Sequence, residues 1–317
     1  MSSNSYYKYQ IFDSTLEVDA ISPELMSSRC QSPAITICRD TLYKDSSEII
    51  WFHNYETPEG QVSISCGKSA DCYQLEFPGL ARFRISRDLK TVRYTTADTT
   101  APEVLRHLLL DQIIPRMYGH HYQTVIHASA IEGEGRVVLF IGPSGIGKST
   151  LAASLHRAGL NLLSDDCVYL KKDILGYRVI PAYSGIRLWR DSAEKVDPNH
   201  NYLKDTKIGK YGKYRMSVRN GDSVKFNNQL VSIVVLNPMA TNEKMSPLLT
   251  PLAKVGIIPE LLKNSFTLDI TDEKYLQKQL IEFSRLANGK NENFQFNYPR
   301  CFESLDKVVN YLCASFW

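Results

Sequence analysis

The feature that most constrains this chain is a glycine-rich turn between an apolar run and an expected helix. Residues 142–149 read Gly-Pro-Ser-Gly-Ile-Gly-Lys-Ser, which satisfies the pattern G-x-x-x-x-G-K-[ST]. The apolar run 137–141 predicts a buried strand before the turn, and residues 149–158 predict a helix that stops at Gly159. In this context successive amides can point at phosphate oxygens beside a helix N-terminus. The sequence therefore predicts an α/β fold that binds a nucleotide at this turn.

The turn also predicts which residues hold the nucleotide and its metal ion. Lys148 would reach the β- and γ-phosphates, and the Ser149 hydroxyl would ligate Mg²⁺. The cofactors expected from the motif are ATP and Mg²⁺. The predicted nucleotide-binding residues of the turn are Gly142, Pro143, Ser144, Gly145, Ile146, Gly147, Lys148, Ser149 and Thr150.

Two carboxylates follow the turn at a short spacing. Asp165 and Asp166 lie 17 and 18 residues after Lys148, directly behind a second apolar run at 160–163. Strand, turn, helix and strand predict a βαβ unit in a parallel sheet, whose ligands bind at the carboxyl ends of the strands. One carboxylate would bind Mg²⁺ and the other would accept the proton of an acceptor hydroxyl. The short spacing is typical of kinases that act on small or side-chain hydroxyls; the alternative is a solvated turn.

The rest of the chain predicts two parts. Short alternating runs at 48–52, 62–66, 73–77, 81–85 and 91–94 indicate a β-rich module over residues 1–98. A helix that opens at Pro102, with Thr99 or Thr100 as its cap, would begin a second domain over residues 99–317. That domain is expected to hold a central strand at 230–236 and a late helix from Thr271. The expected apolar face of this helix is Leu276, Leu280, Phe283 and Leu286.

Composition and charge exclude several classes of protein. Lys and Arg total 37 against 34 acidic residues, so neither a polyanion-coating role nor a nucleic-acid partner is expected. Seven cysteines with no CxxC pair argue against a disulfide framework and a zinc site, and they suit a reducing cytoplasm. The start of the sequence predicts no signal peptide, and no apolar run approaches the roughly 20 residues of a membrane span. We expect a cytoplasmic protein without a membrane partner.

Three segments, taken in order, resemble a known family. His127-Ala-Ser-Ala130, the glycine-rich turn and Leu162-Leu-Ser-Asp-Asp-Cys-Val168 look like the core of HPr kinase/phosphorylase. More specifically, they are similar to the HPr-kinase-like proteins encoded with lasso peptides, which phosphorylate a C-terminal serine of the precursor. The segment 181–189 also looks like that branch, so the resemblance runs from His127 to Trp189. It implies a P-loop kinase core, a serine kinase activity and a peptide substrate such as a lasso-peptide precursor.

The resemblance also implies roles for single residues. Asp166 falls on the general base of the family, Asp165 on its acidic neighbour, which helps with Mg²⁺ or with orientation, and His127 on its active-site histidine. Arg187 matches an arginine that follows the second strand. The alternative for His127 is a strand-end histidine satisfied by a backbone hydrogen bond.

The sequence departs from the HPr-directed members at one metal ligand. Those members carry a Glu two residues before the arginine, whereas Gly185 stands here, and Glu194 is the candidate substitute. Residues 1–98 do not resemble their N-terminal domain either. Neither HPr as substrate nor reverse dephosphorylation is therefore expected, and a homo-oligomer stays open.

A basic segment and two rival functions complete the predictions. Residues 204–219 hold six basic side chains against one acid, which indicates a solvated loop, a lid over the triphosphate or a clamp for a peptide carboxylate. The first rival is a small-molecule kinase of the shikimate or gluconate type, although the glycine-rich turn lies nearly midway along this chain. The second is a non-catalytic nucleotide-binding regulator, which would not need the Asp pair.

Overall fold

The computed structural model describes residues 6–20, 22–23, 25–40, 48–57, 59–121, 123–183, 185–198, 213–216, 229–239 and 246–317. The chain forms two compact units, one of residues 1–122 and 267–276, the other of residues 123–266 and 277–317. The division into domains 1–98 and 99–317 stays a prediction. Among the described residues, no helix combines the length and the apolar character that crossing a membrane requires.

The first unit contains a sheet that is nine strands wide within the described residues. Its strands are β1 (Tyr7–Ile11), β2 (Ser14–Val18), β3 (Met26–Ser27), β4 (Ile35–Arg39), β5 (Ile50–Glu56), β6 (Val62–Lys68), β7 (Cys72–Phe77), β8 (Ala81–Ser86) and β9 (Thr91–Thr96). They lie in the order β3-β1-β2-β4-β9-β8-β7-β6-β5, and β4 runs parallel to both β2 and β9 while the other pairs are antiparallel. The five predicted strands are therefore confirmed as β5–β9.

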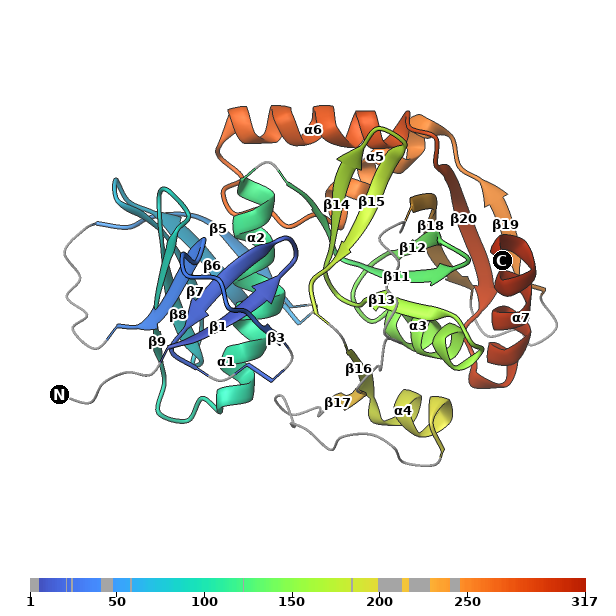
Figure 1. Ribbon diagram of the computed structural model, residues 1–317, viewed down its shortest axis with the longest axis horizontal. Helices are drawn as coiled ribbons and strands as arrows, with labels where there is room; N and C mark the ends of the chain where they lie inside the picture. The colour runs from blue at the N-terminus through green and yellow to red at the C-terminus, as the bar shows by residue number, and fades with distance from the viewer. Residues whose placement is uncertain are drawn as a thin grey trace. The chain divides into compact units, whose positions relative to one another are not determined.

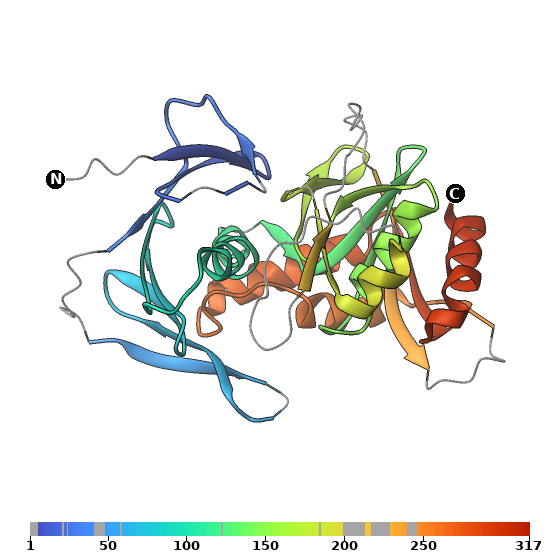
Figure 2. The same ribbon diagram turned by 90° about the horizontal axis from the view of Figure 1, so that it is seen from below.

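The first unit also contains a helical segment that follows β9. It consists of α1 (Pro102–Leu108), the π-helical turn η1 (Leu109–Ile113) and α2 (Ile114–His120). Because Pro115 has no N–H group, the regular hydrogen-bond ladder cannot pass through it, and Ile114 N–H donates to the Leu109 carbonyl instead. Figure 2 shows this segment end-on in teal, with the sheet of the unit curving around it.

The predicted cap of this helix is wrong. Ala101 precedes the helix and makes no side-chain cap, while the Thr100 hydroxyl donates to the Leu80 carbonyl at 2.6 Å. Pro102 supplies the helix start on its own, because the ring fixes φ and the missing N–H is one of the groups that the first turn leaves unbonded.

The second unit is built on a mixed sheet. Its strands are β10 (Thr124–Ile126), β11 (Ala128–Gly133), β12 (Arg136–Ile141), β13 (Asn161–Ser164), β14 (Val168–Asp173), β15 (Gly176–Pro181), β18 (Gln229–Met239), β19 (Leu248–Pro251) and β20 (Glu292–Pro299). The order is β10-β14-β15-β18-β12-β11-β13, and β20 pairs with β18 and β19. Strand β18 runs parallel to both β12 and β20, which confirms the predicted central strand.

The predicted parallel βαβ arrangement needs a correction. Strand β11 lies between β12 and β13 and is antiparallel to both, so β12 and β13 are not neighbours. The reason is a tight hairpin: Glu134 and Gly135 both have positive φ, at 55° and 80°, which joins β11 to β12 in the twist that two-residue hairpins favour.

Helices cover both faces of this sheet (Figure 1). They are α3 (Lys148–Arg157), α4 (Arg190–Val196) and α7 (Leu305–Phe316) on one face, and α5 (Lys254–Lys263) and α6 (Glu273–Ala287) on the other. Along β12, Val138 and Phe140 pack with the first set, whereas Val137, Leu139 and Ile141 pack with the second. A strand that is buried on both faces has a continuous run of apolar residues in its sequence. The run at 137–141 is the pattern from which β12 was predicted.

Helix α6 departs from its prediction at one position. Leu280 is exposed, whereas Phe283, Leu286 and Ala287 are buried and pack against the strands. The buried face of α6 therefore includes Phe283, Leu286 and Ala287 but not Leu280.

Candidate active site

The glycine-rich turn has the curled backbone that its sequence predicted. It joins β12 to α3, and Gly142, Gly145 and Gly147 take φ values of 149°, 78° and 113°. Gly147 stands directly before α3, in a conformation that residues with a side chain rarely adopt. A Cβ atom there would also lie 3.5 Å from the Tyr298 hydroxyl. The turn thus brings its amides to a helix N-terminus, which suits an anionic group.

Lys148 folds back over its own turn. Its side chain is buried, and Nζ donates to the carbonyls of Gly142 at 2.7 Å and Pro143 at 3.1 Å. Burial lowers the pKa of Lys148 to about 8, although the charges of Asp166 and Asp165 oppose that shift. A buried ammonium bonded to neutral carbonyls fits a phosphate ligand, because the phosphate charge would offset the cost of burial.

Asp165 lies beneath the turn and is 2% exposed. Its Oδ1 atom accepts hydrogen bonds from Ser129 Oγ at 2.5 Å and from Ser149 Oγ at 3.1 Å. The Oδ2 atom is buried and has no hydrogen-bond donor among the described residues. Burial, and then the negative charge of Asp166, raise the pKa of Asp165 above its ordinary value.

The Asp165 carboxylate and the Ser149 hydroxyl fit a magnesium site. Both offer the hard oxygen ligands that Mg²⁺ prefers, and one Asp165 oxygen accepts no hydrogen bond from the described part of the chain. Among the described residues, no group of three or more His, Cys, Asp or Glu side chains is placed to hold a metal. Mg²⁺ commonly takes one or two carboxylates and completes its shell with water and substrate phosphates, so two protein ligands suffice here.

Asp166 is held by an arginine. Arg187 Nη2 lies 2.8 Å from Asp166 Oδ2, and the two side chains are 10% and 15% exposed. Burial acts to raise the pKa of Asp166, but the positive charges of Arg187, His127 and Lys213 outweigh it and keep the pKa below its ordinary range. The backbone of Asp166 has a φ of 64°, which is uncommon for a residue other than glycine.

His127 stands between β10 and β11 and contacts the backbone of Asp166. Its Nδ1 atom lies 2.9 Å from the Asp166 carbonyl oxygen, so this nitrogen donates. The structure therefore forms the backbone hydrogen bond that the sequence offered as an alternative. His127 also lines the pocket described next.

A pocket of about 340 Å³ gathers most of the predicted residues. The predicted residues that line it are His127, Ser144, Gly145, Ile146, Gly147, Lys148, Ser149, Thr150, Asp166 and Arg187. Gly142, Pro143 and Asp165 do not line it, and Asp165 is joined to it through Ser149. The whole pocket belongs to the second unit.

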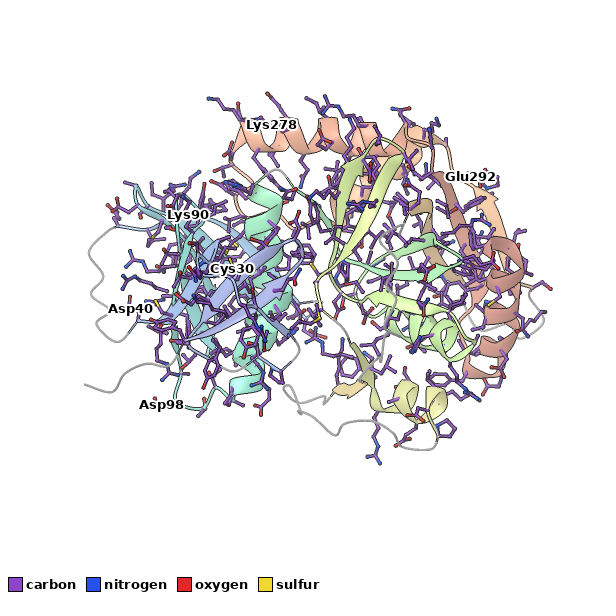
Figure 3. All side chains as sticks on the ribbon, in the orientation of Figure 1. Cys30, Asp40, Lys90, Asp98, Lys278 and Glu292 are labelled. Carbon is purple, nitrogen blue, oxygen red and sulfur yellow. The ribbon has the colours of Figure 1, made fainter. Side chains whose placement is uncertain are left out.

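One wall of the pocket was not predicted from the sequence. It follows the end of β20, the strand that begins at Glu292, labelled in Figure 3. Tyr298 donates its hydroxyl to the Ile146 carbonyl at 3.1 Å, and Arg300 donates to the Gly145 carbonyl. These contacts join residues 152 and 155 positions apart, so no local signal could reveal them. Both brace the glycine-rich turn.

A two-stranded sheet, β16 (Ile186–Trp189) and β17 (Lys213–Met216), forms another wall. Strand β17 is the described part of the basic segment 204–219; the rest of that segment lies outside the described residues. Lys213 stands opposite Trp189, and its ammonium lies 5.2 Å from the centre of the indole ring.

The suggested metal role of Glu194 is not supported. Glu194 Oε1 lies 2.8 Å from Arg190 Nε on the exposed side of α4, and Glu194 does not line the pocket. Asp191, three residues earlier, does line it, and Ser129 bonds to Asp165 from β11. Neither was predicted. A signal existed for Ser129, because it lies within the segment 127–130 that carries part of the family resemblance.

Comparison with known proteins gives a local similarity. No family model matches the chain. An HPr kinase/phosphorylase from Bacillus licheniformis is 35% identical over 85 residues, which cover 27% of this chain and 23% of that protein. A solved structure, the Hpr(Ser) kinase/phosphatase from Coxiella burnetii, aligns at 15% identity with a TM-score of 0.27, covering 60% of this chain and 97% of that one. The chain thus spans about a quarter of the curated relative that it matches, and the similarity to an HPr kinase is local.

Proposed function

We propose that this protein is an ATP- and Mg²⁺-dependent kinase that phosphorylates a serine hydroxyl on a peptide or protein. The observation that carries the proposal is the arrangement around Asp166. This carboxylate, paired with Arg187, lines the same pocket as Lys148 and the glycine-rich turn. A phosphate-binding turn alone indicates nucleotide binding, whereas a carboxylate facing the same space adds a group that can receive an acceptor hydroxyl.

The donor side consists of the turn and its lysine. Lys148 and the backbone amides would neutralise charge that spreads over the transferring phosphoryl group. Ser149 and Asp165 would hold Mg²⁺, which supplies further neutralisation of the β- and γ-phosphates when it is bound. Ser129 keeps the Asp165 carboxylate oriented through its short hydrogen bond.

The acceptor side consists of Asp166 and its partners. Because Arg187 lowers the pKa of Asp166, the carboxylate is ionised at neutral pH and accepts a hydrogen bond from a hydroxyl. A carboxylate of low pKa is a weak base, and a loose phosphoryl-transfer transition state needs orientation of the attacking oxygen more than early removal of its proton. We therefore assign Asp166 to positioning the hydroxyl first and to accepting its proton late.

The preferred acceptor in this proposal is the C-terminal serine of a lasso-peptide precursor, phosphorylated in the cytoplasm. The support is the similarity of residues 127–189 to the kinases of that type, together with the local identity to an HPr kinase/phosphorylase. In this proposal a β-rich N-terminal domain precedes the kinase domain, and no nucleic acid or membrane takes part.

The test is transfer of labelled phosphate from Mg·ATP to a set of acceptors. The set holds peptides that end in serine, the same peptides amidated, HPr, shikimate and gluconate, and Asp166→Asn is assayed beside the wild type. Labelling of serine peptides, reduced by about 10²-fold or more in Asp166→Asn with ATP binding retained, supports the proposal. Labelling of shikimate or gluconate alone points to a small-molecule kinase. ATP binding without transfer to any acceptor points to a nucleotide-binding regulator.

A further inference from the structure

We propose that Lys213 and Trp189 form the subsite that recognises the C-terminal carboxylate of the acceptor, with the Lys213 ammonium as the anion-binding group and the Trp189 ring beside it. This inference rests on the proposed kinase function and assigns two residues of the same pocket to recognition of the acceptor. Both residues line that pocket, on the wall made by β16 and β17.

The strand register places the two residues on one face with Arg187. Arg187 and Trp189 are two positions apart on β16, so their side chains point to the same side. Lys213 is the direct partner of Trp189 in the antiparallel pair, and directly opposed residues share a face. One face of the sheet therefore carries, in order, the arginine that holds Asp166, the indole ring and the Lys213 ammonium.

The charges on this face leave Lys213 available for a ligand. Arg187 is paired with Asp166, and Lys148 is bonded to the carbonyls of its own turn. Lys213 makes no ion pair with any of the residues that the structure describes, and its ammonium contacts the Trp189 ring instead. A cation that faces a pocket and forms no ion pair with the described residues is suited to an anion that arrives with a ligand.

The position of Lys213 favours the acceptor over the donor as the source of that anion. The donor phosphates already have Lys148 and the amides of the glycine-rich turn. Lys213 instead belongs to the strand pair that holds Asp166, where the hydroxyl must lie if Asp166 receives its proton. Trp189, which is 42% exposed, adds a flat apolar surface beside the cation on which the neighbouring part of a peptide can pack.

The experiment compares peptides ending in serine, as free acids and as amides, with three proteins: wild type, Lys213→Met and Lys195→Met. Lys195 is an exposed lysine of α4 that does not line the pocket, so its variant is the matched control. The free acid should have a KM about tenfold or more below that of the amide with the wild type and with Lys195→Met. Lys213→Met should remove this preference and leave the KM for ATP within about twofold of wild type.

Two results would overturn the inference while the kinase assignment stands. One is equal use of acid and amide by the wild type. The other is a rise in the KM for ATP in Lys213→Met with the acid preference intact, which would place this lysine on the donor phosphates.

A binding measurement separates the failure of the subsite from the failure of the kinase. The fluorescence of Trp189 should change when the free-acid peptide is added without nucleotide, and the change should be absent with the amide, in Lys213→Met and in Trp189→Phe. If no protein transfers phosphate but this acid-specific signal persists, the kinase proposal fails and the carboxylate subsite remains. If transfer occurs without the signal and without acid preference, the subsite fails.

Discussion

Arg187 and Asp166 form an ion pair in the wall of the pocket, with 2.8 Å between Nη2 and Oδ2 and with little of either side chain exposed. The pair joins β16 to the residues that follow β13. Removing one member of a buried pair leaves the other charge uncompensated, so the two side chains depend on each other. Arg187 also lowers the pKa of Asp166. Removing the arginine should therefore change the pH dependence of phosphate transfer.

Arg187→Met should shift the pH dependence of phosphate transfer. Arg187 lowers the pKa of Asp166, so its removal raises that pKa, and the ionised carboxylate is then present only at higher pH. We expect the acidic limb of the kcat profile to move upward by about one pH unit or more, so that the loss relative to wild type grows as the pH falls and is smallest near pH 8. Steady-state rates measured from about pH 5 to about pH 8 check it.

Arg190→Met provides the control for that series. Arg190 belongs to an exposed ion pair with Glu194, and exposed pairs contribute little. Its variant should keep the wild-type profile. An Arg187→Met protein that remains folded at the assay temperature and shows an unshifted profile would contradict the role given to this ion pair.

The lowered pKa of Lys148 should make ATP affinity depend on pH, independently of Asp166. The buried ammonium has a pKa of about 8 in the ligand-free protein, and only its charged form attracts the phosphates. Affinity for ATP should therefore be constant from about pH 7 to pH 8 and fall by about tenfold per unit above that. Calorimetry in buffers of different ionisation enthalpy should detect proton uptake on binding above pH 8. Lys148→Arg, which stays charged, should bind with no such dependence.

The local parts of this site could be predicted from the sequence, and the long-range parts could not. The turn 142–149 is defined by its own glycines and by the flanking strand and helix, so its conformation follows from neighbouring residues. The Asp pair was found because it ends the next strand. Tyr298 lies at the end of β20 and Arg300 directly after it, more than 150 positions from the turn, and nothing near them marks the contact.

The sheet order was missed for a related reason. A strand, a helix and a strand suggested that β12 and β13 pair with each other, but β11 lies between them and pairs with both. The two-residue turn at Glu134 and Gly135 brings β11 beside β12, because a hairpin closes a much shorter loop than a crossover helix does.

Comparing Gly147→Ala with Gly159→Ala should separate an effect of the turn conformation on ATP binding from a general loss of stability. Gly147 and Gly159 have similar φ values, 113° and 104°, which a Cβ atom makes unfavourable by about 1–3 kcal/mol. Gly159 ends α3 away from the pocket, with no atom within 4 Å of an added Cβ. Both Ala variants should lose a similar amount of thermal stability, but Gly147→Ala alone should weaken ATP binding. Equal ATP affinity in the two variants would contradict the role of the turn.

Asp165→Asn should stabilise the folded protein while it abolishes Mg²⁺-dependent transfer. Burial raises the pKa of Asp165 above its unfolded value, so the folded state holds that proton more tightly than the unfolded state does. The stability due to this proton is present at low pH and is lost as pH rises through the folded pKa. Asn mimics the protonated carboxyl at every pH, and it can still bond to the Ser129 and Ser149 hydroxyls.

The two proteins should therefore unfold at similar temperatures near pH 5, and the variant should unfold at least about 2 °C higher near pH 8, since 1 kcal/mol corresponds to about 2–4 °C for a folding unit of about 150–250 residues. Thermal unfolding without nucleotide or Mg²⁺ measures the difference. Asp166 keeps its partner in both proteins, so its opposite pH dependence largely cancels from the comparison. A constant difference, or a less stable variant at high pH, would mean that the Asp165 carboxylate is well solvated or paired. If the difference in unfolding temperature grows as the pH rises, the ionised Asp165 carboxylate lowers the stability of the fold at the pH where it would bind Mg²⁺. This is expected for a group that serves binding rather than folding.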